Sequence, residues 1–236
     1  MEIITLNTNI YKEKDVILKA VTIEGESSFL VKGMMSNKSV NLPLNNPLVI
    51  ADVELNEGQY KYPLIKKSKI IHSPYHLNDD LHNMLIINAI NEITNRLMQD
   101  EDYFDIYPLL NEAIIDLEKK NIDSSSVLLI YLANVLKIIG FDFEINHCIA
   151  CNSKKNIKAF SFNEGGYICK DCLMNFHVDN LSNEAMMVIR NMFLSTSLKP
   201  LNYLNDDVLK EILKAINNFL NEAMGTPLKT LDLLIE

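Results

Sequence analysis

The chain has 236 residues, of which 48% are hydrophobic and 22% are charged, and its formal net charge is −9 at pH 7. This length provides one large domain or two modest ones with a buried core, and the composition excludes a disordered or collagen-like chain. The longest apolar run, residues 127–139, is interrupted by Asn134 and Lys137 and falls short of the roughly 20 residues that span a bilayer, so we expect no membrane partner.

The charge is unevenly distributed along the chain. Residues 1–72 carry nine lysines and eight acidic residues, a net charge of +1, whereas residues 73–236 carry 13 basic and 23 acidic residues, a net charge of −10. A near-neutral segment binds nucleic acid only if its lysines lie on one face, and an acidic segment is not expected to bind it. Any DNA contact is therefore expected in the N-terminal part.

Short strands are expected over residues 1–74, which we take as the first domain. Apolar and polar residues alternate there with the period of a half-buried strand, and β-branched residues are frequent. The expected strands are 4–10, 16–23, 29–31, 48–55 and 59–70, with Gly25 in a turn between the second and the third. Five short strands suit a closed barrel of the oligonucleotide/oligosaccharide-binding (OB) type, although a small sandwich would use the same pattern.

Helices are expected over residues 75–236, the second domain. Asn78, Asp79 and Asp80 provide the short polar side chains that begin a helix, and apolar residues then recur at intervals of three and four. Further helices are expected near 103–119, 124–139, 182–196 and 205–224. Gly140 and Gly225 stand where the third helix and the last helix should end. The expected fold class is α+β, with an OB barrel followed by a helical domain.

All four cysteines of the chain lie between the third and fourth expected helices. Cys148 and Cys151 form one Cys-x-x-Cys pair, and Cys169 and Cys172 form another after a spacer of seventeen residues. This pattern is typical of zinc sites, because each pair turns two thiolates toward one metal and a hairpin in the spacer brings the pairs together. Four thiolates leave no position for a substrate. We therefore expect one structural Zn²⁺ per chain, in a ribbon at residues 146–176.

Other uses of the cysteines remain open. Two disulfides would need an oxidising compartment, a redox pair usually needs one Cys-x-x-Cys, and four thiolates also bind iron–sulfur clusters. His147 and His177 flank the site, and we expect both to be neighbours of the metal and not ligands. The first residues lack the basic start and apolar stretch of a signal peptide, so a reducing cytoplasm is expected.

The sequence contains no recognisable catalytic motif. It lacks phosphate-binding loops, dinucleotide fingerprints, His-Glu-x-x-His and the nucleophile elbow. The acidic pairs at 79–80 and 206–207 lie at expected helix starts, where they interact favourably with the helix dipole. We therefore expect a protein that is not an enzyme.

Five segments contain sequence patterns that are longer than a single Cys-x-x-Cys pair. A polar turn follows the first strand at 11–15, a strand ends in Lys-Gly at 28–33, and Gly-Phe-Asp-Phe at 140–143 leads into the first cysteine pair. Phe-Ser and Gly-Gly precede the second pair, and Gly-Thr-Pro-Leu-Lys-Thr-Leu occupies 225–231. In this order, and over nearly the whole chain, these segments resemble the bacterial RecO family of recombination mediators.

The resemblance implies an N-terminal OB barrel, a helical domain with an inserted zinc ribbon, and a role in DNA repair and recombination. Members of that family bind single- and double-stranded DNA and anneal complementary strands. They contact single-strand-binding protein and RecR, and so help to load RecA. The same function is expected here, in the bacterial cytoplasm in association with the nucleoid.

One segment departs from the family pattern. After Lys-Gly the family usually carries several Arg and Lys residues, whereas residues 34–39 here contain one charged residue, Lys38. Fewer phosphate contacts should weaken DNA binding. The candidates that remain are Lys12, Lys14, Lys32, Lys38, Lys61, Lys66 and Lys67, each of which could equally be a solvated surface lysine. Tyr11, Tyr60 and Tyr62 are candidates for base stacking, with core packing as the alternative for the last two.

Two other functions therefore stay open. A protein-interaction adaptor of the same fold would have little DNA affinity of its own, and a nucleic-acid-modifying enzyme with an accessory ribbon would show turnover that does not depend on the thiolate site. Met186, Met187 and Met192 are candidates for adaptable contacts with partner proteins, with core packing as the alternative.

Overall fold

The computed structural model describes residues 1–36, 38–56, 61–76 and 80–236. The chain divides into two compact units: the first is Met1–Asp80 with Leu97–Asn121, and the second is Leu81–Arg96 with Ile122–Glu236. The first unit thus includes one helix, α2 (Tyr103–Lys119), that lies beyond the expected boundary at residue 74. It belongs to this unit because it packs on the strands. The second unit contains all four cysteines.

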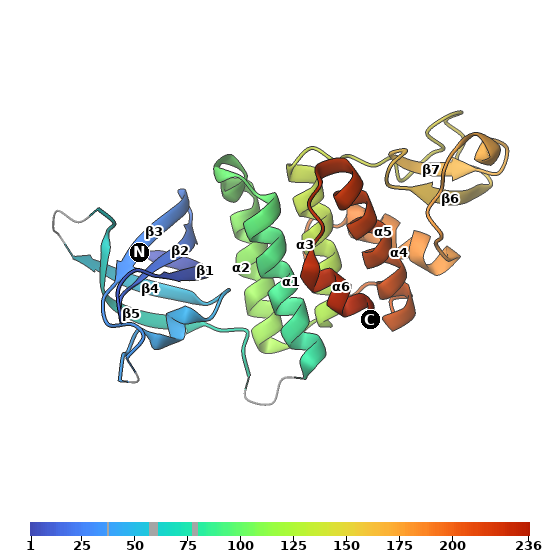
Figure 1. Ribbon diagram of the computed structural model, residues 1–236. Coiled ribbons are helices and arrows are strands. Elements are labelled where there is room, and N and C mark those ends of the chain that lie inside the picture. The colour runs from blue at the N-terminus through green and yellow to red at the C-terminus, as the bar shows by residue number, and fades with distance from the viewer. Residues whose placement is uncertain (37, 57–60, 77–79) are drawn as a thin grey trace. The chain divides into compact units, whose positions relative to one another are not determined.

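Five strands of the first unit form a closed barrel in the order β1-β2-β3-β5-β4 (Figure 1). They are β1 (Glu2–Ile10), β2 (Val16–Thr22), β3 (Gly25–Val31), β4 (Ile50–Asn56) and β5 (Leu64–His72). Neighbouring strands are antiparallel, except that β3 and β5 pair in parallel. The predicted five-stranded barrel is confirmed, and the sandwich is excluded.

The barrel encloses a core of apolar side chains. Its buried members are Ile3, Val16, Leu18, Ala20, Phe29, Val31, Met34, Leu44, Ala51, Val53 and Ile65. Gly33, with φ +62°, turns the chain after β3, and Met34 beyond it is fully buried. The segment that follows Lys-Gly therefore begins by filling the barrel, so that one of its positions is not available to a charged side chain.

Helix α2 (Tyr103–Lys119) packs on the barrel and completes the first unit. The hydroxyl of Tyr107 donates a hydrogen bond of 2.8 Å to Oε1 of Glu2, on β1. Toward the other end of the helix, Glu118 accepts a hydrogen bond of 3.0 Å from the backbone N–H of Ser73, which follows β5. Two carboxylates thus attach α2 to the first and last strands of the barrel.

Helices make up most of the second unit. They are α1 (Leu81–Leu97), α3 (Ser124–Ile138), α4 (Asn183–Leu194), α5 (Asp206–Met224) and α6 (Lys229–Ile235). Helix α3 is buried on most of its surface, as its apolar sequence requires. Helix α6 was not predicted, because Pro227 was interpreted only as the end of α5. No helix in the described residues combines the length and apolar character needed to cross a membrane.

Polar side chains begin three of these helices. Asp123 accepts a hydrogen bond from the backbone N–H of Ser126, and Ser182 and Asn205 begin α4 and α5 in the same way. Gly225, with φ +62°, ends α5 as predicted. Asn78 and Asp79, which were expected to begin α1, lie outside the described residues.

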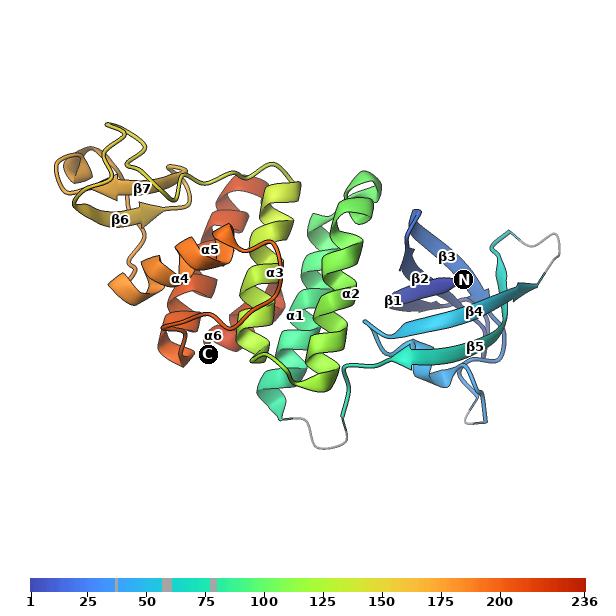
Figure 2. The same cartoon turned by 180° about the vertical axis from the view of Figure 1, so that it is seen from behind.

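A two-stranded hairpin of β6 (Ile157–Ser161) and β7 (Gly166–Cys169) separates α3 from α4 in the chain. Figures 1 and 2 show this hairpin at one end of the second unit, beyond α4 and α5. The spacer between the cysteine pairs therefore forms the predicted hairpin, and the described chain as a whole is α+β.

Aromatic side chains fix the hairpin on the helices. The ring of Phe143 lies 6.0 Å from that of Phe160 on β6, 5.2 Å from that of Phe193 on α4 and 5.5 Å from that of Phe219 on α5, measured between centroids. The Phe143–Phe219 pair is edge-to-face. Such pairs contribute about 0.5–1.5 kcal/mol each beyond the area that they bury. The segment that leads into the first cysteine pair is thus held by three elements.

Candidate metal centre

The first cysteine pair lies in a tight turn. The backbone N–H of Cys148 donates to the carbonyl of Ser153 at 2.8 Å, and that of Asn152 donates to the carbonyl of Cys148 at 2.9 Å. Asn152 has φ +59°, in the left-handed region that asparagine enters more readily than most residues. The N–H of Ile149 donates to the carbonyl of Tyr167 at 2.9 Å, which attaches the turn to β7.

The second cysteine pair follows directly from β7. Cys169 ends the strand, and the N–H of Cys172 donates to the carbonyl of Cys169 at 3.1 Å. A short 3-10 helix, Leu173–Asn175, begins immediately afterwards. The N–H of Lys170 donates to the carbonyl of Asn156 at 2.9 Å. The second turn is thus anchored to the segment that precedes β6.

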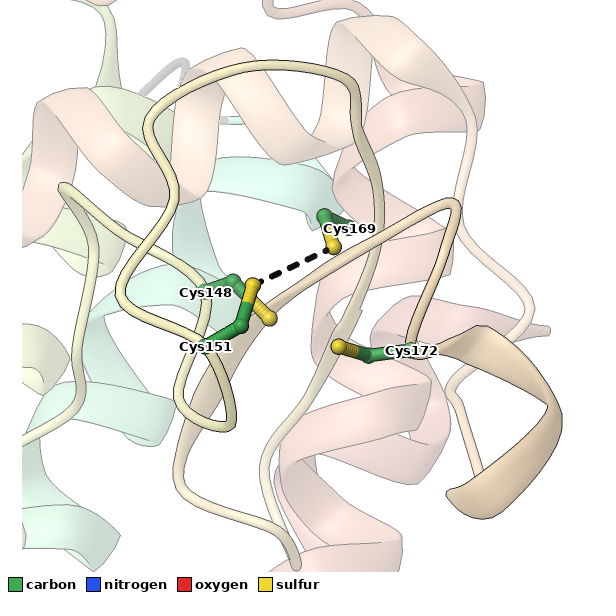
Figure 3. Close-up of side chains that lie close together, drawn as sticks. All are labelled: Cys148, Cys151, Cys169 and Cys172. Atoms are coloured by element: carbon green, nitrogen blue, oxygen red, sulfur yellow. Dashed lines mark hydrogen bonds between the residues drawn. The ribbon is translucent and has the colours of Figure 1, made fainter.

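The four sulfur atoms point toward one another, as Figure 3 shows. All four Sγ atoms lie within 4.8 Å of one another, and those of Cys151 and Cys169 are 3.6 Å apart. A tetrahedral zinc ion with Zn–S bonds of about 2.3 Å needs sulfurs about 3.8 Å apart. The cysteines Cys148, Cys151, Cys169 and Cys172 could therefore hold one metal ion with little movement.

The surroundings of the sulfurs lower the pKa of one thiol, that of Cys148, and raise the pKa of another, that of Cys172. Burial opposes ionisation of Cys148, but hydrogen bonds from the backbone of Cys169, Cys151 and Ala150 outweigh it and lower its pKa to about 6. Hydrogen bonds with the sulfurs of Cys169 and Cys151 raise the pKa of Cys172 to about 12. A cluster of like charges needs a cation before it can ionise fully, which a divalent metal supplies.

The two flanking histidines are not in the cluster. The residues that could share a metal are the four cysteines alone within the described chain. His147 Nδ1 instead lies 3.1 Å from Oε1 of Glu144, and His177 is exposed. The donor set is thus four sulfurs, which suits zinc and also suits iron–sulfur chemistry.

Three candidate DNA-binding lysines lie at one end of the barrel. Lys12 and Lys14 are in the turn between β1 and β2, and Lys32 directly follows β3; Lys38 lies further along the segment after β3, and all four are exposed. Two hydrogen bonds join the β1–β2 turn to the segment after β3. The N–H of Met35 donates to the carbonyl of Lys14 at 3.1 Å, and the N–H of Gly33 donates to the carboxylate of Asp15 at 2.8 Å.

The other three candidates lie along β5 or just before it. Lys61 is exposed and close in sequence to Pro63, whose carbonyl accepts a hydrogen bond of 2.9 Å from the N–H of Leu30, near the end of β3. Lys66 and Lys67 are both exposed on β5. Lys67 pairs across the strands with Glu54 of β4, so its charge is partly offset.

The aromatic and methionine candidates differ in exposure. Tyr11 is 51% exposed beside Lys12, whereas Tyr62 is half-buried with the Lys61 ammonium 5.4 Å from its ring centroid. Tyr60 lies outside the described residues. Among the methionines of α4, Met186 and Met192 are buried and Met187 is exposed. Most of that stripe therefore packs in the core.

The C-terminal signature is held by polar groups that the sequence did not reveal. The carboxylate of Glu92, on α1, accepts hydrogen bonds from the N–H groups of Lys229 (3.1 Å) and Thr230 (2.7 Å). The side chain of Asn217, on α5, accepts from the N–H of Leu228 at 2.7 Å. These partners are distant in sequence, and no local pattern identifies them.

Comparison with known proteins identifies the family. The family described as "Recombination protein O C terminal" matches residues 78–232. The DNA repair protein RecO of Thermoanaerobacter sp. (strain X514) is 24% identical over 237 residues, which is 99% of this chain and 95% of the relative. The DNA repair protein RecO of Mycoplasma mycoides subsp. mycoides SC is 27% identical over 230 residues, or 94% and 91% of the two chains.

A third relative, the DNA repair protein RecO of Caldanaerobacter subterraneus subsp. tengcongensis, is 26% identical over 173 residues, 72% of this chain and 70% of the relative. The family match covers more than half of the chain, including the whole cysteine cluster. The barrel, the helical unit and the four-cysteine ribbon have the order that the resemblance implied. This chain therefore belongs to the RecO family of DNA repair proteins, which are recombination mediators and not enzymes.

Proposed function

We propose that this protein is a recombination mediator that binds and anneals DNA and, together with RecR, helps to load RecA onto strands coated by single-strand-binding protein. Its membership of the RecO family over nearly the whole chain carries this proposal. The protein would act in the bacterial cytoplasm, in association with the nucleoid.

The metal in the ribbon would be Zn²⁺, one per chain, held by Cys148, Cys151, Cys169 and Cys172. Their convergence within 4.8 Å supports this assignment, as does the hairpin between the two pairs. Zinc bound by four thiolates has no open position, so it would stabilise the fold of the ribbon without contacting DNA.

The barrel, within residues 1–74, would bind the DNA backbone. The support is the exposure of all seven candidate lysines: Lys12, Lys14 and Lys32 at one end of the barrel, Lys38 further along the segment after β3, Lys61 just before β5, and Lys66 and Lys67 on β5. Such a surface follows phosphates without reading sequence, and Tyr11 could stack on a base. Annealing then requires only that lysines reduce the repulsion between two strands, and no covalent bond changes.

One observation favours a second function, the protein-interaction adaptor. Met34 is fully buried directly after Lys-Gly, where the family that the sequence resembles usually carries basic residues. The barrel would then have fewer phosphate contacts and a lower affinity at physiological salt. The helical unit would supply the surface for partner proteins.

The two functions are separated by an annealing assay. Complementary strands are coated with the cognate single-strand-binding protein, and their pairing is followed without nucleotide at low and at physiological salt. The mediator should accelerate pairing, and the double variant Lys32→Glu, Lys38→Glu should lose most of that acceleration. The control variant Lys199→Glu, Lys214→Glu changes the charge equally on exposed positions of the second unit and should retain it.

No acceleration at either salt, by protein shown to contain its metal, would overturn the mediator and favour the adaptor. Equal loss in both double variants would mean that net charge matters and the barrel lysines do not.

A further inference from the structure

The ribbon is a basic region within the acidic part of the chain. Residues 146–176 carry four lysines and two acidic residues, a net charge of +2. The remaining residues of 73–236 carry nine basic and 21 acidic residues, a net charge of −12. Averaging the charge over the whole second part of the chain conceals this difference.

The hairpin places the backbone of the second cysteine turn beside the segment that carries the other ribbon lysines. The four ribbon lysines are Lys154, Lys155, Lys158 and Lys170, and all are exposed. Ile157 at the start of β6 pairs with Cys169 at the end of β7, and the N–H of Lys170 donates to the carbonyl of Asn156. None of the four lysines forms an ion pair within the described parts of the chain. Their like charges repel one another, so an anionic partner would stabilise this arrangement.

A groove of about 420 Å³ lies between the ribbon and α4. Its lining contains two cations, Lys154 and Arg190, together with apolar side chains such as Ile157 and Met187, and no carboxylate. Nη2 of Arg190 donates a hydrogen bond of 3.2 Å to Oδ1 of Asn146, which holds the guanidinium beside the groove. The groove thus combines apolar contact surface with two positive charges.

A second groove shows that this charge pattern is not general. It has a volume of about 560 Å³, and Asp179, Asp207 and Glu211 line it together with lysines. Its mixed charges give no preference for an anion. The absence of carboxylates from the lining of the groove with Lys154 and Arg190 is therefore a local property in an acidic unit.

The metal centre itself offers a simpler reason for the lysines. Zinc with four thiolates has a formal charge of −2, which attracts nearby cations. That attraction would account for lysines around the sulfurs. It does not account for Arg190, which comes from α4, or for the apolar lining of the groove.

We propose that the ribbon lysines and the groove beside α4 form a second DNA-contacting surface, which takes a single strand. The lysines contact phosphates, and the apolar lining contacts bases that are not stacked in a duplex. This inference rests on the proposed function, because annealing needs two strands held at once and the barrel would bind the other. It also revises the expectation that the acidic second part does not bind DNA.

The test compares oligo(dT) binding by four forms of the full chain, measured by fluorescence anisotropy across a fourfold range of salt. In the ribbon variant Lys154, Lys155, Lys158 and Lys170 become Gln. In the barrel variant Lys12, Lys14, Lys32 and Lys38 become Gln. In the control variant Lys199, Lys210, Lys214 and Lys229 become Gln, which removes the same charge from elsewhere in residues 122–236.

Each lost phosphate contact should reduce the slope of log K against log salt by about 0.7, so the ribbon variant should lose up to about 3. When salt rises fourfold, the affinity of the unaltered chain and that of the ribbon variant should both fall. The factor for the unaltered chain should be about 50 times the factor for the ribbon variant. The control should match the unaltered chain. An unchanged metal content and melting temperature would show that the ribbon remains folded.

Photocrosslinking of the unaltered chain to strands that contain 4-thiothymidine provides a readout that needs no variant. Crosslinked peptides from residues 146–176 are expected. Two results together would overturn the second DNA-contacting surface: crosslinks confined to the barrel, and a ribbon variant that keeps the full salt slope. They would not contradict the proposed function as a recombination mediator. No DNA binding by the unaltered chain would remove both proposals. A further outcome is a ribbon variant that binds DNA normally but no longer binds a synthetic peptide of Asp and Leu that the unaltered chain binds. That result would show that the groove binds a protein segment and not DNA, and it would also overturn the inference.

Discussion

The four candidate sulfur ligands are not equivalent in their surroundings. Cys148 and Cys169 are each 1% exposed, whereas Cys151 is exposed and Cys172 is intermediate. A ligand that is buried also fills space between the hairpin and the turns around it. Replacing such a cysteine therefore removes both a metal ligand and part of the packing.

We expect Cys169→Ser to reduce the zinc content from about one per chain to nearly none. A hydroxyl does not replace the missing thiolate, and the three remaining sulfurs leave the tetrahedron incomplete. Mass spectrometry of the metal in the purified chain measures this directly. Met174→Ala is the matched control, because Met174 lies in the same ribbon and is 93% exposed. A variant that retained one zinc would exclude Cys169 as a ligand.

Glu118 provides a second effect at the scale of one residue. Partial burial opposes its ionisation, but the hydrogen bond from the backbone of Ser73 and the interactions with His72 and His76 outweigh burial and lower its pKa. Its carboxylate lies 2.6 Å from Nδ1 of His72. A folded-state pKa below the unfolded value stabilises the fold at pH above the unfolded value, and this stabilisation is lost as the pH falls through the folded pKa.

Glu118→Gln should therefore lower the free energy of unfolding at neutral pH. The effect should be less than about 1 kcal/mol, because solvent screens a partly exposed pair. The difference between the variant and the unaltered chain should shrink as the pH falls below the ordinary pKa of glutamate, and it should vanish once the pH is below the lowered folded-state pKa of Glu118. Urea unfolding curves across this pH range provide the measurement. A difference that persisted at low pH would mean that packing, not charge, is responsible.

At the scale of elements, the hairpin depends on a close approach of the chain before the cysteines. Glu144 N–H donates to the carbonyl of Gly165, and Tyr167 N–H donates to the carbonyl of Glu144, both at 2.9 Å. Gly166 lies between these two bonds with φ +150°. A Cβ atom at Gly166 would stand 2.3 Å from the carbonyl oxygen of Glu144. The hairpin can pair with this segment only because the position has no side chain.

Gly166→Ala should consequently destabilise the ribbon more than Gly165→Ala. Both positions have positive φ, which costs about 1–3 kcal/mol for a residue with a side chain. Only at Gly166 does a clash with backbone add to this cost, since Gly165 has nothing within 4 Å of its Cβ position. Hydrogen exchange at the Tyr167 amide should be faster in the Gly166 variant. Equal exchange in the two variants would show that the segment before the cysteines moves aside easily.

At the scale of the whole molecule, the four-cysteine cluster and the barrel belong to different compact units. The four cysteines are in the second unit, and the barrel strands are in the first. The barrel has its own apolar core and no cysteine. Metal binding and barrel folding should therefore be separable.

Removal of the metal by a chelator should increase hydrogen exchange in residues 146–176 and leave the barrel strands protected. The reason is that the binding free energy of a structural zinc is largely the folding free energy of its own ribbon. Exchange followed by mass spectrometry gives both regions in one experiment, and re-addition of zinc should restore protection. Loss of protection in the barrel as well would mean that the two units unfold together.

Local patterns were sufficient for much of the architecture. Strand alternation, helix periodicity and cap residues predicted five strands and five helices, because each depends on neighbours within a few residues. The two Cys-x-x-Cys pairs predicted the cluster for the same reason, since each turn is local and the spacer is short. Helix α6 was not predicted from the sequence, because the residues that hold its start are distant from it in sequence. Glu92 and Asn217 accept hydrogen bonds from the segment before α6 and from its first turn.

Surface properties required the tertiary structure. The turn between β1 and β2 and the start of the segment after β3 meet through hydrogen bonds that no sequence period encodes, so only the fold could group Lys12 and Lys14 with Lys32. In the same way, only the fold showed that the ribbon and Arg190 share a groove without carboxylates. Composition sums charge along the chain, whereas a binding partner meets the charge that folding brings onto one surface.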